Sequence, residues 1–386
     1  MSPHQEDHSQ LQGNLAEWQS ITPMRVGRCS HAVVTVGSYL YSFGGQPAGG
    51  THVSSDVEIL NTKTGRWTKS GDTMLTARSY FAAAVVEKTK VLICGGEGCK
   101  VDAKNDEDAI VTVRSFVELY DTVDGTSTFM PEMNFKRMKC AASAVRNKVY
   151  VFGGMDEENR LVDIVEVFCM EKRVWQVLRN RLPIVAPKLM SWRVQAVAIE
   201  DQIYILGMPF TGIFNTQTLQ FLPKETLPSF WRRNMQTSSS VAIGDKIVLA
   251  EYGNAETNFI LLDTKTHLMA PLPSLQGRRE PVGELAVVGF DIYSTGGFLD
   301  DDRFKHPVDD CEDSSCFSMT LSQRWRSSPA VSPREEVCAN PDCIQEFFKD
   351  GLKYCPCRKV LYCSRDCQIQ HRKVHKTDCK IPKISQ

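Results

Sequence analysis

The sequence predicts an all-β fold, arranged as a closed ring of six repeated units and followed by a small cysteine-rich module. Two observations lead to this prediction. An alternating apolar run that ends at or near a glycine pair recurs about every fifty residues over most of the chain. Seven of the fourteen cysteines then lie close together between Cys338 and Cys379.

The composition is that of a globular protein. The 386 residues are 42% hydrophobic and 24% charged, with a formal net charge of −1, which excludes a disordered chain and a general polyanion binder. The first residues lack an apolar signal core, and no run approaches the roughly 18 apolar residues of a membrane span. We therefore expect an intracellular protein of the cytoplasm, the nucleus or both, with reduced cysteines.

The repeated unit is clearest in its first three copies, which end at the glycine pairs 44–45, 95–96 and 153–154. Each copy begins with a run of small residues, which suits an inner strand near a crowded axis. A second strand-like run and an aromatic residue follow each glycine pair. Weaker copies at 201–208, 245–253 and 290–297 bring the number to six, and six copies imply a closed ring.

These units resemble kelch repeats. The resemblance rests on the glycine pairs, on the acidic residues Glu58, Glu118 and Glu166 before the third strand, and on the closing residues Trp67, Trp175 and Trp325. It implies a β-propeller of six four-stranded blades over residues 18–326, preceded by a polar N-terminal segment at 1–17. Copies four and five depart from the pattern at Met208 and at 251–253. Trp18 and Trp325 both suit an outer strand, so the ring could be closed by the N-terminal strand, the C-terminal strand or both.

Arginines recur at one position of the repeat. Arg28, Arg78 and Arg137 each lie four residues before the first alanine of an inner strand, and Arg193, Arg233 and Arg279 lie near the equivalent place. Such a ring could clamp an acidic peptide of a partner through bidentate contacts. The alternative is that they are surface arginines that bond loop carbonyl groups. The sequence leaves both interpretations open.

A Ser/Pro-rich linker at 327–334 separates the ring from the last unit, residues 335–386. About fifty residues cannot bury a sufficient core, so something other than hydrophobic burial must stabilise this unit. Its soft metal ligands are Cys338, Cys343, Cys355, Cys357, Cys363, Cys367, His371, His375 and Cys379. Tetrahedral zinc takes four ligands, so nine candidates suffice for two ions.

The spacing of the last ligands limits how they can be shared. Residues 364–376 contain no glycine or proline and read as a helix. Cys367 and His375 are then about 12 Å apart along the axis, at roughly 1.5 Å per residue, which is too far for one zinc ion. Cys363 and Cys367 therefore belong to one ion, and His375 and Cys379 belong to another. Spacing leaves open whether the first cysteine pair joins the former site, an interleaved arrangement, or the latter, a nested one.

The last unit resembles a MYND zinc finger, through C-x4-C, CPC, YCSRDCQ and H-x3-C in that order over residues 338–379. The resemblance implies the interleaved arrangement, with His371 as the spare ligand. Zinc 1 would bind Cys338, Cys343, Cys363 and Cys367, and zinc 2 would bind Cys355, Cys357, His375 and Cys379. It also places Gln368 and Arg372 among candidate peptide contacts. The sequence departs from the family at two points: Arg372 stands where the family usually has tryptophan, and CPC stands where it usually has C-x-x-C.

The zinc ions should be structural, because protein ligands fill all four positions of each site. We therefore expect a non-catalytic adaptor whose propeller loops bind one protein and whose finger binds a peptide of another, with proline-containing motifs implied by the resemblance. Recruitment to a ubiquitin ligase is one form of this role. The alternative is a regulator that binds nucleic acid through the basic face of the finger helix. The sequence does not predict the oligomeric state.

Overall fold

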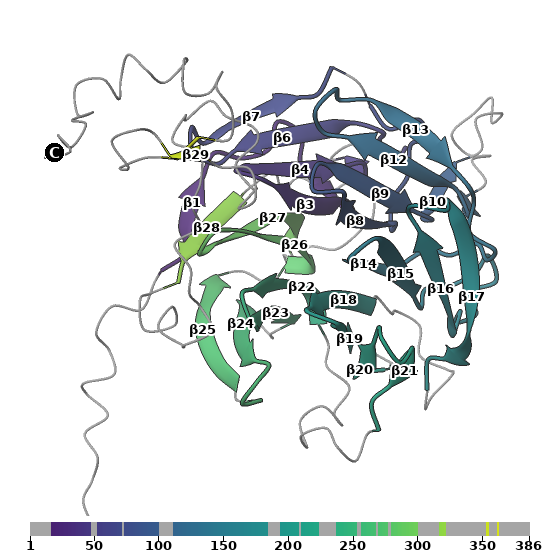
Figure 1. Ribbon diagram of the computed structural model, residues 1–386. Coiled ribbons are helices and arrows are strands. Elements are labelled where there is room, and N and C mark those ends of the chain that lie inside the picture. Colours follow the sequence, from purple (N-terminus) through teal and green to yellow (C-terminus); the bar gives the residue numbers. More distant parts are fainter. Residues whose placement is uncertain are drawn as a thin grey trace, which may run out of the picture.

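The structure is a computed structural model that describes residues 17–47, 52–71, 73–99, 111–183, 194–207, 210–223, 237–252, 256–267, 269–276, 279–299, 316–321, 353–354 and 361–362. Six four-stranded antiparallel sheets radiate from a central axis, so the chain forms a six-bladed β-propeller (Figure 1). This confirms the predicted ring and the number of blades. The predicted finger helix lies outside the described residues.

Each blade runs from an inner strand at the axis to an outer strand at the rim. Blade 1 contains β3 (Ala32–Val36), β4 (Tyr39–Phe43), β6 (Val57–Asn61) and β7 (Arg66–Lys69). Blade 2 contains β8 (Ala82–Val86), β9 (Lys90–Cys94), β12 (Val117–Asp121) and β13 (Ser127–Met130). Blade 3 contains β14 (Ala141–Val145), β15 (Lys148–Phe152), β16 (Ile164–Cys169) and β17 (Val174–Arg181).

The second half of the ring follows the same plan. Blade 4 contains β18 (Val194–Ile199), β19 (Gln202–Gly207), β20 (Gly212–Asn215) and β21 (Gln220–Phe221). Blade 5 contains β22 (Thr237–Ile243), β23 (Lys246–Tyr252), β24 (Glu256–Asp263) and β25 (Met269–Gln276). Blade 6 contains β26 (Arg279–Val288), β27 (Asp291–Leu299), β28 (Cys316–Thr320) and β1 (Gln19–Ile21).

The burial of each strand follows from its distance to the axis. The inner strands β3, β8 and β14 alternate buried and half-buried residues, because successive side chains point to opposite faces of the sheet. In β8, Ala82 and Ala84 pack in the cluster with blade 3, whereas Ala83 and Val85 pack in the cluster with blade 1. The second strands β4, β9 and β15 are buried along nearly their whole length, because neighbouring blades cover both of their faces. The hydrophobic clusters accordingly form between adjacent blades, as between blades 1 and 2.

The N-terminal strand closes the ring. β1 pairs antiparallel with β28 over Gln19↔Ser318 to Ile21↔Cys316, so it supplies the outer strand of blade 6, whose three inner strands come from the end of the repeat region. Segments almost 300 residues apart therefore share one sheet (Figure 1). This decides between the closures that the sequence left open.

Tryptophans join neighbouring blades at the rim. The indole nitrogen of Trp175 in blade 3 donates to the Pro131 carbonyl group after blade 2, at 2.7 Å. Trp67 of blade 1 donates to Thr22 O, just after β1, at 3.0 Å. Trp18, next to β1, donates to Pro273 O of blade 5 at 2.7 Å. Trp18 thus takes in blade 6 the role that the repeat pattern gives to Trp325, which lies outside the described residues.

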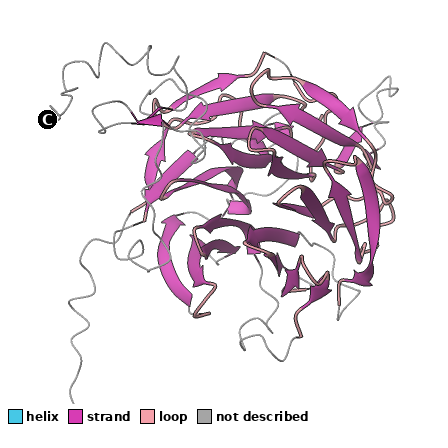
Figure 2. Ribbon diagram, in the orientation of Figure 1, coloured by secondary structure: helices cyan, strands magenta, loops and turns pink. Residues whose placement is uncertain are grey.

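Strands and connecting loops make up the described part of the chain (Figure 2). Three short pairs lie outside the blades: β2 (Arg28–Cys29) with β5 (Gln46–Pro47), β10 (Glu97–Cys99) with β11 (Val111–Val113), and β29 (Lys353–Tyr354) with β30 (Leu361–Tyr362). No helix among the described residues could cross a membrane.

Candidate functional site

One end of the propeller carries the features that the sequence singled out. We call it the glycine-pair face: the end at which the inner strands begin, the second strands stop at their glycine pairs, and the third strands begin. In blades 1 to 3 its surface consists of the loops before the inner strands and those after the glycine pairs. The short β2–β5 and β10–β11 pairs lie within these loops.

The glycine pairs are required by close backbone contacts. Gly154 has a φ of +93°, and a Cβ atom there would lie 2.6 Å from the Met138 carbonyl oxygen. Any side chain would both strain the backbone and displace the preceding loop. The pairs also link blades, since Gly45 N donates to Arg78 O and Gly96 N donates to Arg137 O, each at 2.9 Å.

Behind this face, each of the first three blades contains a buried ion pair. Arg28 donates to Glu58 at 2.5 Å and Arg137 donates to Glu166 at 2.6 Å, while Arg78 pairs with Glu118 in the same way. A second donor of each arginine is also used, because Nη1 lies 3.0 Å from the carbonyl oxygen of the first glycine of its pair. The burial of Arg78 lowers the pKa of its guanidinium group, and the Glu118 carboxylate opposes this shift.

The glutamates also hold the loops in place, in addition to pairing with the arginines. Glu58 accepts a hydrogen bond from Arg25 N at 2.8 Å, and Glu166 accepts one from Asn134 N at 2.7 Å. Glu118 accepts one from Leu75 N, also at 2.7 Å. Each carboxylate therefore ties the loop three residues before its arginine to the third strand of the blade, which makes the loops a rigid surface.

This geometry corrects one interpretation of the arginines. Arg28, Arg78 and Arg137 are almost completely buried and directed at carboxylates and carbonyl groups of their own blades, so they do not form an exposed clamp. The structure shows the alternative, in which the arginines bond to carbonyl groups of the loops. These bonds lie inside the blades and not on the surface. The side chains of Arg193, Arg233 and Arg279 lie outside the described residues. Sequence reasoning missed the pairing, although both partners had been noted as repeated residues.

A second repeated feature runs across the face. Ser30, Tyr80 and Lys139 each precede an inner strand by two residues and have a left-handed backbone, with φ of 53°, 53° and 55°. Tyr80 N donates to Ser30 O at 3.0 Å, and Lys139 N donates to Tyr80 O at 2.7 Å, which links three blades in series. The Lys139 ammonium group also lies 5.0 Å from the centre of the Tyr80 ring. Non-glycine residues in this conformation often mark functional surfaces.

The loops before the inner strands expose apolar side chains. Val26, Leu75 and Phe135 are 39%, 47% and 37% exposed, and each lies two or three residues before a buried arginine. In β10, which follows the second glycine pair, burial raises the pKa of Glu97, and the Ser79 hydroxyl and the Lys139 charge oppose this shift. Blades 1 to 3 thus present a row of apolar side chains with a few charges, on loops that the buried ion pairs hold in place.

Little of the predicted zinc module is described. All eight predicted zinc ligands, the spare His371, and the candidate contacts Gln368 and Arg372 lie outside the described residues. The structure does describe the backbone of an antiparallel pair, with Lys353↔Tyr362 and Tyr354↔Leu361 in register. Cys355 directly follows one strand and Cys363 directly follows the other.

Comparisons with known proteins agree with both units. Residues 30–250 match the KLHDC2/KLHL20/DRC7 Kelch-repeats domain, and residues 337–379 match the MYND finger, a zinc-binding domain. Relatives include Kelch-like protein 38 of Mus musculus, 24% identical over 50% of this chain and 31% of its own length. Another is F-box/kelch-repeat protein At1g67480 of Arabidopsis thaliana, 31% identical over 41% of this chain and 43% of its own length.

The chain spans less than half the length of these relatives. The kelch match nevertheless covers more than half of this chain, and the six-bladed propeller is the fold that the repeats imply. The protein therefore belongs to the kelch-repeat family and carries a MYND finger after its propeller.

Proposed function

We propose that this protein is a non-catalytic adaptor that binds one partner protein on the glycine-pair face and a second through the finger. The observation that supports it best is the row of exposed apolar side chains, Val26, Leu75 and Phe135, on loops that buried ion pairs hold in place. Exposed apolar groups on rigid loops favour protein binding, because little conformational entropy is lost when a partner covers them.

For the finger, we propose two structural zinc ions in the interleaved arrangement. The β29–β30 register supports it, because antiparallel strands end at opposite ends of their ladder. β29 and β30 thus end at opposite ends of the ladder, and Cys355 and Cys363 are the next residues in the chain, which favours their binding different ions. The nested arrangement would place them on the same ion. With four protein ligands at each ion, no position stays open for catalysis.

We further propose that the finger takes a proline-containing peptide, with Gln368 and Arg372 among the contacts. A proline-rich segment is largely pre-ordered before binding, so it suits a small module with limited contact area. This part of the proposal rests on the MYND match alone.

The two binding roles can be separated in one experiment. Full-length protein, the L75D/F135D double variant and the Q368A/R372A double variant would each be used for affinity capture from cells, with quantitative mass spectrometry. We expect two groups of partners, one lost with each variant. A Val177→Asp variant is the matched control, because Val177 is an exposed apolar residue on the outer strand β17, away from the face. Identical partner lists for all four proteins would contradict the adaptor role.

A further inference from the structure

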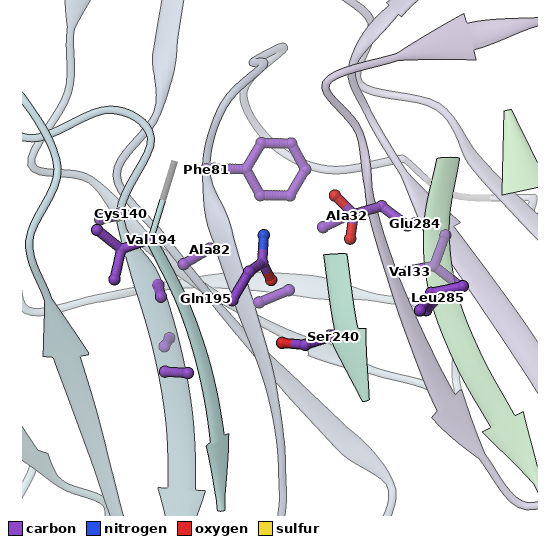
Figure 3. A pocket seen from close by; sticks show the side chains of 14 residues that line it. Ala32, Val33, Phe81, Ala82, Cys140, Val194, Gln195, Ser240, Glu284 and Leu285 are labelled. Atoms are coloured by element: carbon purple, nitrogen blue, oxygen red, sulfur yellow. The ribbon is translucent and has the colours of Figure 1, made fainter. Parts of the chain in front are cut away.

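The pocket on the axis of the propeller is polar. It has a volume of about 110 Å³, the inner strands line it, and the side chains of Gln195, Ser240 and Glu284 lie around it (Figure 3). The alanines that line it belong to the hydrophobic clusters between blades, as Ala32 and Ala82 do. The exposed apolar side chains of the propeller therefore lie farther from the axis, on the loops and the outer strands.

Apolar side chains gather around the buried Glu118 of blade 2. Phe129 lies opposite Glu118 in the β12–β13 ladder, and Phe116 precedes Glu118 by two residues. The two rings meet edge to face, with their centres 6.4 Å apart and their planes at 70°. The backbone N–H group of Leu75 donates to the Glu118 carboxylate at 2.7 Å. We call Leu75, Phe116 and Phe129 the blade 2 patch, in which Leu75 and Phe129 are 47% and 59% exposed.

The equivalent positions of blade 1 have a different chemistry. Asp56 precedes Glu58 by two residues, and Lys69 lies opposite Glu58 in the β6–β7 ladder. The side chains of Asp56 and Lys69 form an ion pair at 2.8 Å. The repeat thus accepts a charged pair at these positions, so the fold does not require the aromatic pair of blade 2. Exposed apolar side chains that the fold does not require favour a role in binding.

One cation lies beside the patch. The guanidinium group of Arg114 lies over the Phe116 ring, 5.4 Å from its centre. Such a group can still donate hydrogen bonds in its own plane, because its N–H groups point outward from its edge. Nearby carboxylates have partners of their own, since Glu118 is buried in its ion pair and Glu132 accepts from Ser115 Oγ at 2.5 Å. Arg114 therefore favours a carboxylate and disfavours an ammonium group at this end of the patch.

The combination indicates one kind of occupant. The two rings and Leu75 suit an aliphatic side chain, and Arg114 suits a carboxylate a short distance away in the same segment. We propose that the blade 2 patch binds a short acidic segment of the partner protein, with an aliphatic side chain on Leu75 and Phe129 and a carboxylate at Arg114. This inference rests on the proposed function and gives the chemistry of the partner on the glycine-pair face.

Three probe peptides, each acetylated and amidated, test the proposal by NMR on the full-length protein. GLLEEG has both features, GLLKKG has the opposite charge, and GSSEEG lacks the aliphatic side chains. We expect GLLEEG to shift the Leu75 methyl and Phe129 amide signals saturably, with a dissociation constant on the order of millimolar for so short a peptide. The other two peptides should bind at least tenfold more weakly. Equal binding of either, or no saturable shift with GLLEEG, would overturn the proposal.

Variants locate the site. The F116D/F129K variant introduces the charged pair that blade 1 carries at the equivalent positions, so it should fold and weaken GLLEEG binding at least tenfold. Val123→Lys is the matched control, because Val123 is an exposed apolar residue in the turn at the other end of the β12–β13 ladder, and it should leave binding unchanged. If the double variant fails to fold, Phe129→Ser decides the question, because it changes one exposed side chain. Undiminished binding of GLLEEG to either folded variant would refute the site.

Arg114→Gln tests the charge separately. It should remove the preference for GLLEEG over GLLKKG and leave the contacts of the aliphatic side chains in place. An unchanged preference would refute the role of Arg114.

Affinity capture from cells distinguishes this inference from the adaptor role. We expect the F116D/F129K variant to lose the partners that the L75D/F135D variant loses. If F116D/F129K retains all of those partners, this inference is wrong and the adaptor role stands. The propeller part of the adaptor role fails only if the L75D/F135D variant itself loses no partner.

Discussion

The guanidinium group of Arg137 donates a hydrogen bond to the carboxylate of Glu166 at 2.6 Å, and both side chains are fully buried between strands of the same blade. This pair connects the loop before an inner strand, the glycine pair and the third strand. The same connection recurs in blades 1 and 2, so it is a structural feature of the repeat. The buried pairs hold the loops that form the candidate binding face.

Removing one partner of this pair should destabilise the propeller strongly. We expect Arg137→Met to lower the free energy of unfolding by about 3–5 kcal/mol, because it leaves the Glu166 charge buried without its guanidinium group. The R137M/E166L double variant should be markedly more stable than Arg137→Met alone, since no buried charge is left behind. Urea denaturation followed by circular dichroism measures both, and a double variant as unstable as the sum of the single variants would contradict this account.

Deleting the N-terminal strand should open the ring. A chain lacking residues 1–22 loses Trp18 and the three residue pairs that β1 makes with β28, and it exposes an unpaired strand edge. We expect a lower urea midpoint and self-association in size-exclusion chromatography with light scattering. A chain lacking only residues 1–16 retains β1 and Trp18 and is the control. Equal stability and equal mass distribution of the two truncated chains would show that β1 does not close the ring.

The second glycine of blade 3 should not tolerate a side chain. Gly154→Ala places a Cβ atom 2.6 Å from a backbone carbonyl oxygen at a φ of +93°, so we expect a loss of about 2 kcal/mol or more in stability. Gly71→Ala is the matched control, because no atom lies within 4 Å of its added Cβ. Thermal unfolding of both variants checks this, and equal melting temperatures would contradict it.

The Asp263 carboxylate, outside the glycine-pair face, should make the free energy of unfolding decrease at acid pH. Burial opposes ionisation of Asp263, but hydrogen bonds from Lys246, Thr266 and Lys265 outweigh it and lower the pKa of Asp263 to about 2. Its folded-state pKa lies below the value of 3.8 taken for a free aspartate. Its contribution is therefore fully present above about pH 4 and is lost as the pH falls toward 2.

The Asp263→Asn variant measures this contribution. At pH 6 it should be less stable than the wild type by about 2 kcal/mol, and the difference should shrink as the pH falls to 2. Asp124→Asn, which removes an exposed carboxylate in the β12–β13 turn, is the control and should show no such trend. A stability difference that does not change with pH would rule out the proposed linkage.

Metal analysis should find two zinc ions for each chain, and chelation should unfold the finger while the propeller signal stays unchanged. Metal binding of about 10–16 kcal/mol would supply most of the folding energy of so small a module. In the ¹¹³Cd-substituted protein we expect one resonance from an all-sulfur site and one from a site with an imidazole ligand. Cys355→Ser should remove the imidazole-type resonance if the sites are interleaved and the all-sulfur resonance if they are nested. Cys169→Ser, in the propeller, should change neither.

The propeller was predictable because its signals are local and repeated. The glycine pairs, the small inner-strand residues and the alternating apolar runs recur at a nearly constant interval, so each copy reinforces the others even where copies four and five depart. The ladder of left-handed residues from Ser30 to Lys139 was not predictable, because nothing in the residue types at those positions signals a positive φ.

By itself the sequence determined the repeat, the type of blade and the number of blades, because periodicity can be read without coordinates, and it predicts the zinc ligands from their chemistry and spacing. Only the tertiary structure decided that Arg137 faces Glu166 and that Trp18 and β1 complete blade 6. The physical reason is common to both. These contacts join residues separated by tens to hundreds of positions, and only the folding of a blade, for the first, or the closing of the ring, for the second, brings them within reach of one another.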